Sequence, residues 1–254
     1  MGLDASQWAL GAAAALLVGI SKTGLPGAGI LVVPVMAALF GSRLSVGTVL
    51  PMLIVGDIFA VAWYRRHARW DKLLKLVPYV LAGVAAGGVV LATLKGKAGS
   101  QSMDALIGVL VLAMLGVHLL RSRVGDRIAP TSPAGVVATG VGAGFATTVS
   151  NAAGPIMQIY LTASGLPKQQ FMGTTAWYFF LINLTKVPVF AYLSLRDPAN
   201  PIMNGSSLTF NAAIAPVIVT GAFIGRWLLP RVPQRLFDNL MLALAAVAAL
   251  NLLR

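Results

Sequence analysis

The sequence predicts an all-α integral membrane protein made of two inverted repeats, each a broken helical hairpin followed by three transmembrane helices. Three observations lead to this fold class: the composition, two interrupted apolar regions, and motifs that recur in both halves. Of the 254 residues, 57% are hydrophobic and 10% are charged, and the mean hydropathy is +0.83. Since a soluble globular chain carries roughly 25% charged residues, this composition suits a bilayer.

The first repeat is expected over residues 1–125, as part of a single membrane domain. Its hairpin is predicted over 8–40, an apolar region that SKTGLPGAG interrupts at 21–29. Glycine and proline both disfavour a helix, and proline also removes a backbone donor. Three uninterrupted apolar segments follow, over 45–64, 73–94 and 103–120. A crossing needs about 20 apolar residues, within a range of about 17–25, so each segment can form one.

The second repeat is expected over residues 126–254 and follows the same plan. Its hairpin is predicted over 134–163, where TTVSNAAGP interrupts the apolar region at 147–155. The three crossings that follow are predicted over 171–192, 208–230 and 237–253. Each broken region predicts two half-length helices with an irregular link. Irregular backbone at membrane depth is tolerated only where protein or a water-filled cavity covers it.

Five sequence features recur in the same order in the two halves. They are the glycine pairs Gly19/Gly29 and Gly144/Gly154, the tripeptides VGT at 46–48 and MGT at 172–174, the polar residues Asp57 and Asn183, the P-x-x-x-x-G-x-x-x-G motifs beginning at Pro78 and Pro216, and the tetrapeptides MDAL at 103–106 and FDNL at 237–240. Agreement in order as well as type indicates a duplication. The paired glycines of the longer motif are expected to let helices approach closely.

The distribution of basic residues predicts the orientation in the membrane. If both hairpins return to their own side, one face collects eleven basic residues, namely Arg65, Arg66, Arg69, Lys72, Lys75, Arg121, Arg123, Arg127, Lys168, Arg231 and Arg235. The other face then collects five, namely Arg43, Lys95, Lys97, Arg196 and Arg254. If each broken region crossed once instead, the same residues would divide ten to six. The positive-inside rule therefore favours returning hairpins, a periplasmic N-terminus and a cytoplasmic RRHARWDK loop.

The two breaks are the predicted substrate site. Inverted repeats with interrupted helices are a common plan of secondary transporters, whose sites lie near the midplane where the half-helices end. Half-helix N-termini carry partial positive charge and free N–H groups, which suits an anion. The predicted anion-binding residues are Ser21, Lys22, Thr23, Gly27, Ala28, Gly29, Thr148, Ser150, Asn151 and Gly154. Neither break contains an acidic residue, which disfavours a cation site.

Four further polar or aromatic residues are expected close to the breaks, as coupling or supporting groups: Asp57, Asn183, Lys186 and Trp177. A lysine at a helix centre costs about 2.5–3.5 kcal/mol on insertion scales, so Lys22 and Lys186 require an explanation. Lys186 could also extend its side chain to an interface. Asp57 could accept a coupling proton or pair with a lysine, and both alternatives stay open.

Other function classes are disfavoured by specific residues. The chain has no cysteine, and we expect no metal site and no cofactor. GISKTG at 19–24 resembles the end of a phosphate loop, but Ser21 stands where that motif needs glycine. Ser21 and Lys22 are sequence neighbours and point in different directions on a helix, so no catalytic residue and no enzyme is predicted. Nucleic acid is not an expected partner, since no soluble basic domain exists to bind it.

Two stretches resemble a known family. TGLPGAG is followed by LVVPVMAALFGSRLSVGT at 31–48, and the second half contains GFATTVSNAAGPIMQIYLTASGLPKQQFMGT at 144–174. Over nearly the whole chain, the sequence resembles the TauE/SafE sulfite-exporter family. It departs from the family pattern at Leu25–Pro26, where many members have more glycine.

The resemblance implies a multi-pass carrier of the bacterial inner membrane that has no cofactor. Its expected substrates are small sulfur oxyanions or organosulfonates, such as sulfite or sulfoacetate. The carrier is expected to export the anion by alternating access, with the anion held between the two hairpin tips at the midplane. Two alternatives are an anion channel and an uptake carrier for thiosulfate or another small anion, both of the same fold. The anion, the direction of transport, a coupling proton or ion and the oligomeric state stay open.

Overall fold

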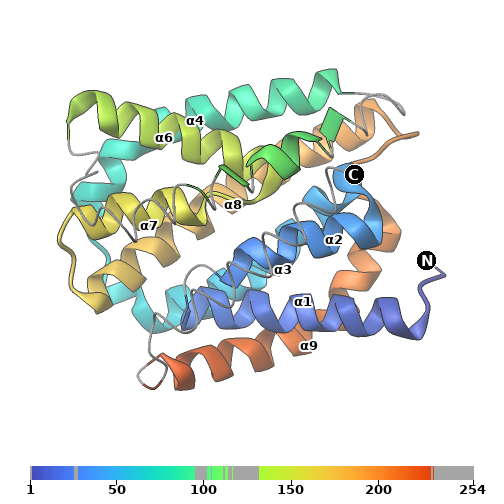
Figure 1. The fold of residues 1–254 in the computed structure, drawn as a ribbon, viewed down its shortest axis with the longest axis horizontal. Helices are drawn as coiled ribbons and strands as arrows, with labels where there is room; N and C mark the ends of the chain where they lie inside the picture. Colours follow the sequence, from blue (N-terminus) through green and yellow to red (C-terminus); the bar gives the residue numbers. More distant parts are fainter. Residues whose placement is uncertain are drawn as a thin grey trace.

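The computed structural model describes residues 2–25, 28–94, 102–103, 105–110, 112–113, 116, 132–229 and 231. All the regular structure in these residues is helical (Figure 1). Four stretches are long and apolar enough to cross a membrane: Ser42–His67, Trp70–Thr93, Lys168–Arg196 and Gly205–Leu228. The protein is therefore a helical, multi-pass membrane protein. The expected crossing over 237–253, and eight of the eighteen residues of the one over 103–120, lie outside the described residues.

Four α-helices and two short 3-10 helices have both ends within the described part of the first half. In chain order they are α1 (Ala5–Thr23), η1 (Ala28–Leu31), α2 (Val32–Phe40), α3 (Ser42–Tyr64), η2 (Arg65–His67) and α4 (Trp70–Thr93). Asp4 begins α1 by accepting a hydrogen bond from the backbone N–H of Gln7. Gly41, with φ 73°, makes the turn between α2 and α3, in a conformation that favours glycine.

The first broken region is a hairpin with unequal arms. Trp8, near the start of α1, and Phe40, at the end of α2, both contact the ring of Phe210, at centroid distances of 5.2 and 4.9 Å. The chain therefore returns to the end from which it started. However, α1 has 19 residues, or about 28 Å at 1.5 Å per residue, against 9 in α2. The expectation of two half-length helices is wrong for the first arm.

The second half repeats this order of helices. They are α6 (Pro133–Ser150), α7 (Gly154–Ala163), α8 (Lys168–Arg196) and α9 (Gly205–Leu228). Ser132 and Asn204 begin α6 and α9 by accepting hydrogen bonds from backbone N–H groups. The hairpin arms are again unequal, since α6 has 18 residues and α7 has 10. Here too, the first arm is longer than the half-length helix that we expected.

Helices of the first half pack against helices of the second half. The main pairs are α1 with α9, α4 with α6 and α3 with α8 (Figure 1). Small residues allow the first two pairs to approach closely. A Cβ atom added at Gly19 would overlap the carbonyl oxygen of Ile218, and one added at Gly144 would overlap that of Val80. These backbones are therefore in direct contact, as expected of the small residues at such interfaces.

Helices α3 and α8 run antiparallel through the middle of the molecule. Near one end Gly173 lies against the backbone of Tyr64, and near the other Gly47 lies against Ile202. Between these contacts Asp57 of α3 meets Asn183 of α8. This crossing places polar groups of the two halves side by side in the interior.

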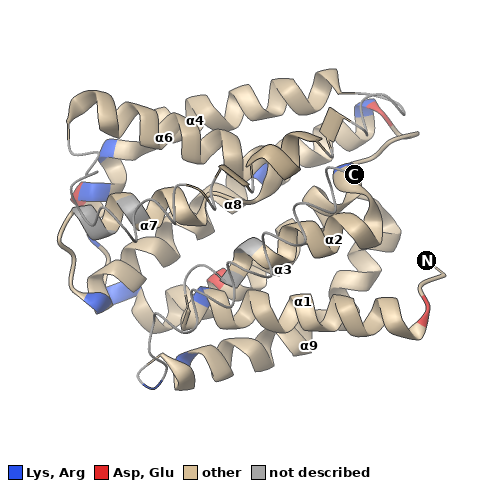
Figure 2. Ribbon diagram, in the orientation of Figure 1, with Lys and Arg blue, Asp and Glu red and all other residues tan. Residues whose placement is uncertain are grey.

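Charged residues gather at the two ends of the helices (Figure 2). One end contains η2, the start of α8 and the end of α9, where the Lys168 ammonium donates to the carbonyl of Leu229 at 2.8 Å. The described basic residues of this end are Arg65, Arg66, Arg69, Lys72, Lys75, Lys168, Arg226 and Arg231. We call it the basic end. The opposite end holds the start of α1, and which end faces the cytoplasm stays a prediction.

Candidate functional site

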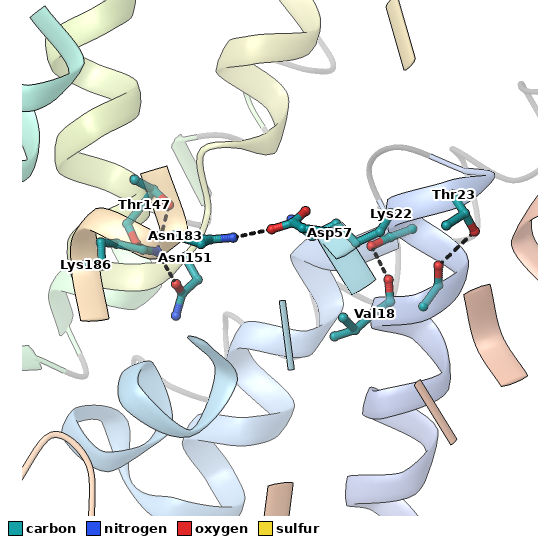
Figure 3. Close-up of polar contacts among 10 residues, drawn as sticks. Val18, Lys22, Thr23, Asp57, Thr147, Asn151, Asn183 and Lys186 are labelled. Carbon is teal, nitrogen blue, oxygen red and sulfur yellow. Dashed lines mark hydrogen bonds and ion pairs between the residues drawn. The ribbon is translucent and has the colours of Figure 1, made fainter. Parts of the chain in front are cut away.

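A buried ion pair joins α1 and α3 of the first half. The Nζ atom of Lys22, in the last turn of α1, lies 2.7 Å from Oδ1 of Asp57 on α3 (Figure 3). The Asp57 side chain has 0% exposure and that of Lys22 has 11%. The ammonium also lies 4.3 Å from the ring centre of Phe179, within the range of a cation–π contact. The structure therefore contains the pairing with a lysine that was one alternative for Asp57.

Asn183 connects this ion pair to the second half. Its amide nitrogen donates to Oδ2 of Asp57 at 2.7 Å, so both carboxylate oxygens contact a donor (Figure 3). The two residues occupy matching places in the repeated motifs, on the antiparallel helices α3 and α8. Each of these side chains has 0% exposure, and an uncompensated buried carboxylate would be strongly unfavourable. The contact with Lys22 and Asn183 supplies that compensation.

Lys186 is a second buried lysine, and it does not reach an interface. Its Nζ atom contacts three oxygens of the α6 terminus: the Thr147 carbonyl at 2.9 Å, the Thr147 hydroxyl at 3.0 Å and Oδ1 of Asn151 at 2.7 Å. The residue has 0% exposure. A cation at a helix C-terminus interacts favourably with the unpaired carbonyls there. Within the described part of the chain no carboxylate forms a salt bridge with Lys186.

Asn151 ends α6 in a left-handed conformation, with φ 56° and ψ 20°. Asparagine tolerates this conformation better than most residues, which explains its use at a helix end that lacks glycine. The side-chain amide nitrogen donates to the carbonyl of Val46 on α3 at 2.9 Å. That bond turns Oδ1 towards Lys186 (Figure 3). Asn151 therefore both ends α6 and holds the Lys186 ammonium in place.

A cavity of about 70 Å³ lies beside these groups, between the two hairpins and α8. Five of the predicted anion-binding residues line it: Ser21, Lys22, Gly29, Asn151 and Gly154. Asp57 lines it as well. The remaining lining residues are Leu53, Thr147, Ala152, Pro155, Gln158, Met172, Thr175, Ala176 and Phe179. The cavity thus combines a cation, several hydrogen-bond donors and an apolar wall.

Several donors at the cavity have no hydrogen-bond partner among the described residues. The hydroxyl of Thr175 is buried, and it forms no hydrogen bond with any described residue. Gln158 is 8% exposed, and its side-chain amide forms no hydrogen bond with any described residue. The first turn of a helix leaves N–H groups without intrahelical acceptors, and Gly154 is the first residue of α7. These groups can hydrogen-bond a molecule that enters the cavity.

The other predicted residues lie elsewhere or use their hydroxyls within the protein. Ser21, Thr23, Thr148 and Ser150 all belong to the last turns of α1 and α6, where we expected an irregular link. Their hydroxyls donate to the carbonyls of Val18, Gly19, Gly144 and Ala146, respectively, and that of Thr23 also bonds to Ala222. These bonds to the preceding turn carry each helix further than its sequence predicted.

Thr23, Thr148, Ser150, Asn183 and Lys186 do not line the cavity, and three more predicted residues have no described contact with it. Gly27 lies outside the described residues, and only the backbone of Ala28, in η1, is described. Trp177 packs against Trp70 at a centroid distance of 5.2 Å and does not line the cavity. Its place beside α4 explains this, because it faces away from α1 on the helix that also carries Phe179.

Sequence reasoning missed the residues that line the cavity from the middle of helices. Thr147 was within reach, since it begins the second break, TTVSNAAGP. Gln158 is the one strongly polar residue between Gly154 and Ala163, which is a usable signal in retrospect. Thr175 and Phe179 carry no such signal, because which face of α8 meets the cavity depends on tertiary packing. No group of three metal-binding side chains occurs in the described residues.

Comparisons with known proteins bear on this site. The model of one protein family, described as Sulfite exporter TauE/SafE, matches residues 11–252 of the chain. Neither a curated protein nor a solved structure matches it. The family match covers both hairpins, both buried lysines and all four candidate spans. The chain therefore belongs to the TauE/SafE sulfite exporter family of membrane transporters.

Proposed function

We propose that the protein is a secondary carrier that binds one small sulfur oxyanion in the cavity beside Lys22. The observation that carries the proposal is the set of unpartnered donors around an interior cation. The Lys22 ammonium, the Thr175 hydroxyl and the Gln158 amide all line the same cavity, and so does the N-terminal residue of α7, Gly154. An anion placed there replaces its water shell with fixed donors and the positive end of a helix.

The size of the cavity favours the smallest substrates of this class. Its volume of about 70 Å³ is half of the roughly 150 Å³ of an engineered cavity that holds benzene. A sulfite or sulfate ion, with four or five heavy atoms, is the appropriate size. The larger organosulfonates require the cavity to widen. We therefore propose sulfite as the preferred substrate, and sulfoacetate as a larger one.

We further propose that the two halves are inverted repeats that rock against each other. Three features support this: α3 and α8 run antiparallel, Asp57 contacts its counterpart Asn183, and the pairing of α1 with α9 mirrors that of α4 with α6. Equivalent glycines also make equivalent contacts, since Gly83 lies against α6 and Gly221 lies against α1. The proposed boundaries are 1–125 and 126–254.

On α8, the cavity lies on the side of Asn183 that faces the basic end. The residues of α8 that line it, from Met172 to Phe179, all precede Asn183, and α8 begins at the basic end. On the other side, an apolar cluster that includes Val46, Leu50 and Phe190 fills the space between α3 and α8. This arrangement fits one state of an alternating-access cycle, in which the apolar cluster is the closed gate. We propose that export requires the cluster to separate.

The first test is calorimetric titration of the purified protein with sulfite. Replacing Lys22 with methionine removes the cation and keeps an apolar chain of similar length, so binding should weaken about tenfold or more. The matched control is Lys168→Met, since Lys168 is exposed at the basic end and bonds only to Leu229. Equal affinity in the two variants would refute the site.

The second test is flux of sulfite into liposomes. A carrier saturates with substrate and can couple to a proton gradient, whereas a channel of the same fold gives flux that does not saturate. We expect sulfite flux through the unmodified protein to saturate with substrate, and we expect the Lys22→Met variant to be inactive. Non-saturating flux would support the channel alternative, and an absence of both flux and binding would refute an anion transporter.

A further inference from the structure

Three charged side chains lie in the interior of the protein, and their charges do not cancel. Lys22, Asp57 and Lys186 are the interior charges at this depth in the described residues. Lys22 and Asp57 pair with each other and Asp57 contacts Asn183, whereas Lys186 contacts Asn151. Towards the basic end, Arg226 and Tyr64 lie at helix ends instead. Two lysines and one aspartate give the interior a net charge of plus one.

The hydrogen-bond geometry fits a carboxylate at Asp57 and an ammonium at Lys186. Asp57 faces an ammonium through one oxygen and an amide donor through the other, both at 2.7 Å, which is the environment of a carboxylate. Lys186 contacts three oxygens, which match the three donors of an ammonium. The Asn151 amide donates to Val46, so its oxygen faces Lys186 and accepts. Each partner therefore has the complementary role.

We infer that Asp57 determines the charge of the substrate: it neutralises one of the two lysines and leaves the site matched to an anion with a single negative charge. This inference rests on the proposed binding of an anion beside Lys22. A bound monoanion brings the interior to neutrality. A dianion leaves one excess negative charge in a region of low dielectric, which is costly unless a proton enters with it.

Asp57 acts through competition as well as through its charge. It lies within hydrogen-bond distance of the Lys22 ammonium and lines the same cavity, so the substrate and the carboxylate share one cation. A monoanion can share Lys22 with Asp57 while Lys186 provides the balancing charge from behind Thr147 and Asn151, which line the cavity. The expected substrates are therefore hydrogen sulfite and singly charged sulfonates. Sulfate, thiosulfate and doubly charged sulfonates would each require one accompanying proton.

The test compares methanesulfonate with sulfate at one fixed pH, by titration calorimetry on the purified full-length protein. The two ions have a similar tetrahedral size, and they differ by one charge because neither changes protonation near neutral pH. We expect the unmodified protein to prefer methanesulfonate. Asp57→Asn raises the interior to plus two, so the ratio of affinities should shift towards sulfate by about tenfold or more.

Three further variants keep the inference falsifiable if Asp57→Asn does not fold. Asn183→Asp and Lys186→Gln each lower the interior charge to zero, so each should weaken methanesulfonate binding about tenfold or more. The double variant Asp57→Asn, Lys22→Met removes both members of the ion pair and keeps plus one, so its preference for methanesulfonate should persist. Circular dichroism and size-exclusion profiles identify the variants that fold.

The outcomes separate the inference from the proposed function. If the unmodified protein binds neither ion nor sulfite, the proposed function fails. If it binds them but the affinity ratio is the same in every folded variant, the anion site stands and the role of Asp57 is refuted. If Lys186→Gln alone has no effect, Lys186 carries no charge, the count of plus one is wrong and the inference is overturned.

Discussion

The substitution Gly144→Ala tests a close backbone contact between the two halves. A Cβ atom at this position would overlap the carbonyl oxygen of Val80 and lie 3.0 Å from the backbone nitrogen of Val84, both on α4. These are backbone atoms, so the contact cannot be relieved by rotating a side chain. Overpacking of this kind costs about 1–3 kcal/mol, because neighbouring elements have to shift.

The neighbouring substitution Gly142→Ala is a matched control on the same helix. A Cβ atom there meets the flexible end of Ile156 at 3.8 Å, which is an ordinary contact. Both substitutions remove the entropy cost of a helical glycine, worth about 0.5–1 kcal/mol, so this gain cancels in the comparison. The difference between the two variants isolates the clash, and we expect Gly144→Ala to be less stable by about 1–3 kcal/mol.

The assay is unfolding of the purified protein in detergent, followed by circular dichroism with increasing denaturant. The counterpart in the first half is Gly19→Ala, where a Cβ atom would overlap the carbonyl oxygen of Ile218, and its effect should be of the same size. Equal stability of Gly144→Ala and Gly142→Ala would refute the direct backbone contact between α4 and α6.

Three further predictions concern single side chains and use the same unfolding assay. Thr23→Val should cost about 1 kcal/mol, because it removes a 2.7 Å bond to α9, whereas Thr148→Val should cost less, since that hydroxyl bonds only within its own helix. Asn151→Ala should be less stable than Asn151→Gly by about 1 kcal/mol, because only alanine is strained at φ 56°. The Ser6 hydroxyl and a backbone N–H hold the pKa of Asp4 below its ordinary value. The contribution of Asp4 to the free energy of unfolding is therefore complete above pH of about 4 and is lost as the pH falls through the lowered pKa. Asp4→Asn should remove this pH dependence.

The sequence was most informative where a physical requirement is local. Hydropathy indicated the apolar helices, because a crossing needs an uninterrupted apolar length. The two breaks were visible as glycine, proline and polar residues in apolar surroundings, and the cavity does lie beside them. The shared offset of Asp57 and Asn183 also had a structural meaning, since these residues contact each other across the antiparallel pair α3 and α8.

The lengths of the first hairpin arms could not be read from the sequence. Ser21 and Thr23 carry low helix propensity, and a glycine follows them, so the sequence indicated an earlier helix end. In the structure, their hydroxyls bond to carbonyls of the preceding turn, and Thr23 gains a partner on α9. A contact between helices that are distant in sequence therefore determines where α1 ends.

The cavity residues on α8 show a second limit of sequence reasoning. Thr175 and Phe179 are spaced by one helical turn and line the cavity, while Trp177 between them packs against Trp70. All three lie in one apolar helix with no strong difference between its faces. The rotation of α8 about its axis is set by its packing against α3 and α4, which no local pattern encodes.

The two halves supply their cation in different ways, and this difference can be tested. Lys22 and Thr147 follow Gly19 and Gly144 at the same spacing, so Thr147 occupies the place of Lys22 in the proposed duplication. The Nζ atom of Lys186 lies 3.0 Å from the Thr147 hydroxyl. In the second half, therefore, a lysine of α8 places an ammonium beside the residue of α6 that corresponds to Lys22 of α1. The position of the charge therefore matters more than the residue that bears it.

Moving the second cation onto α6 is the corresponding experiment. Lys186→Ala leaves the Thr147 carbonyl and the Asn151 oxygen without their donor, so it should lower both stability and methanesulfonate affinity. Adding Thr147→Lys to this variant restores the charge beside Asn183, as Lys22 lies beside Asp57. We expect the double variant to regain methanesulfonate affinity to within about tenfold of the unmodified protein. A folded double variant that binds no better than Lys186→Ala would show that Lys186 acts through its contacts with the α6 terminus and not through its charge.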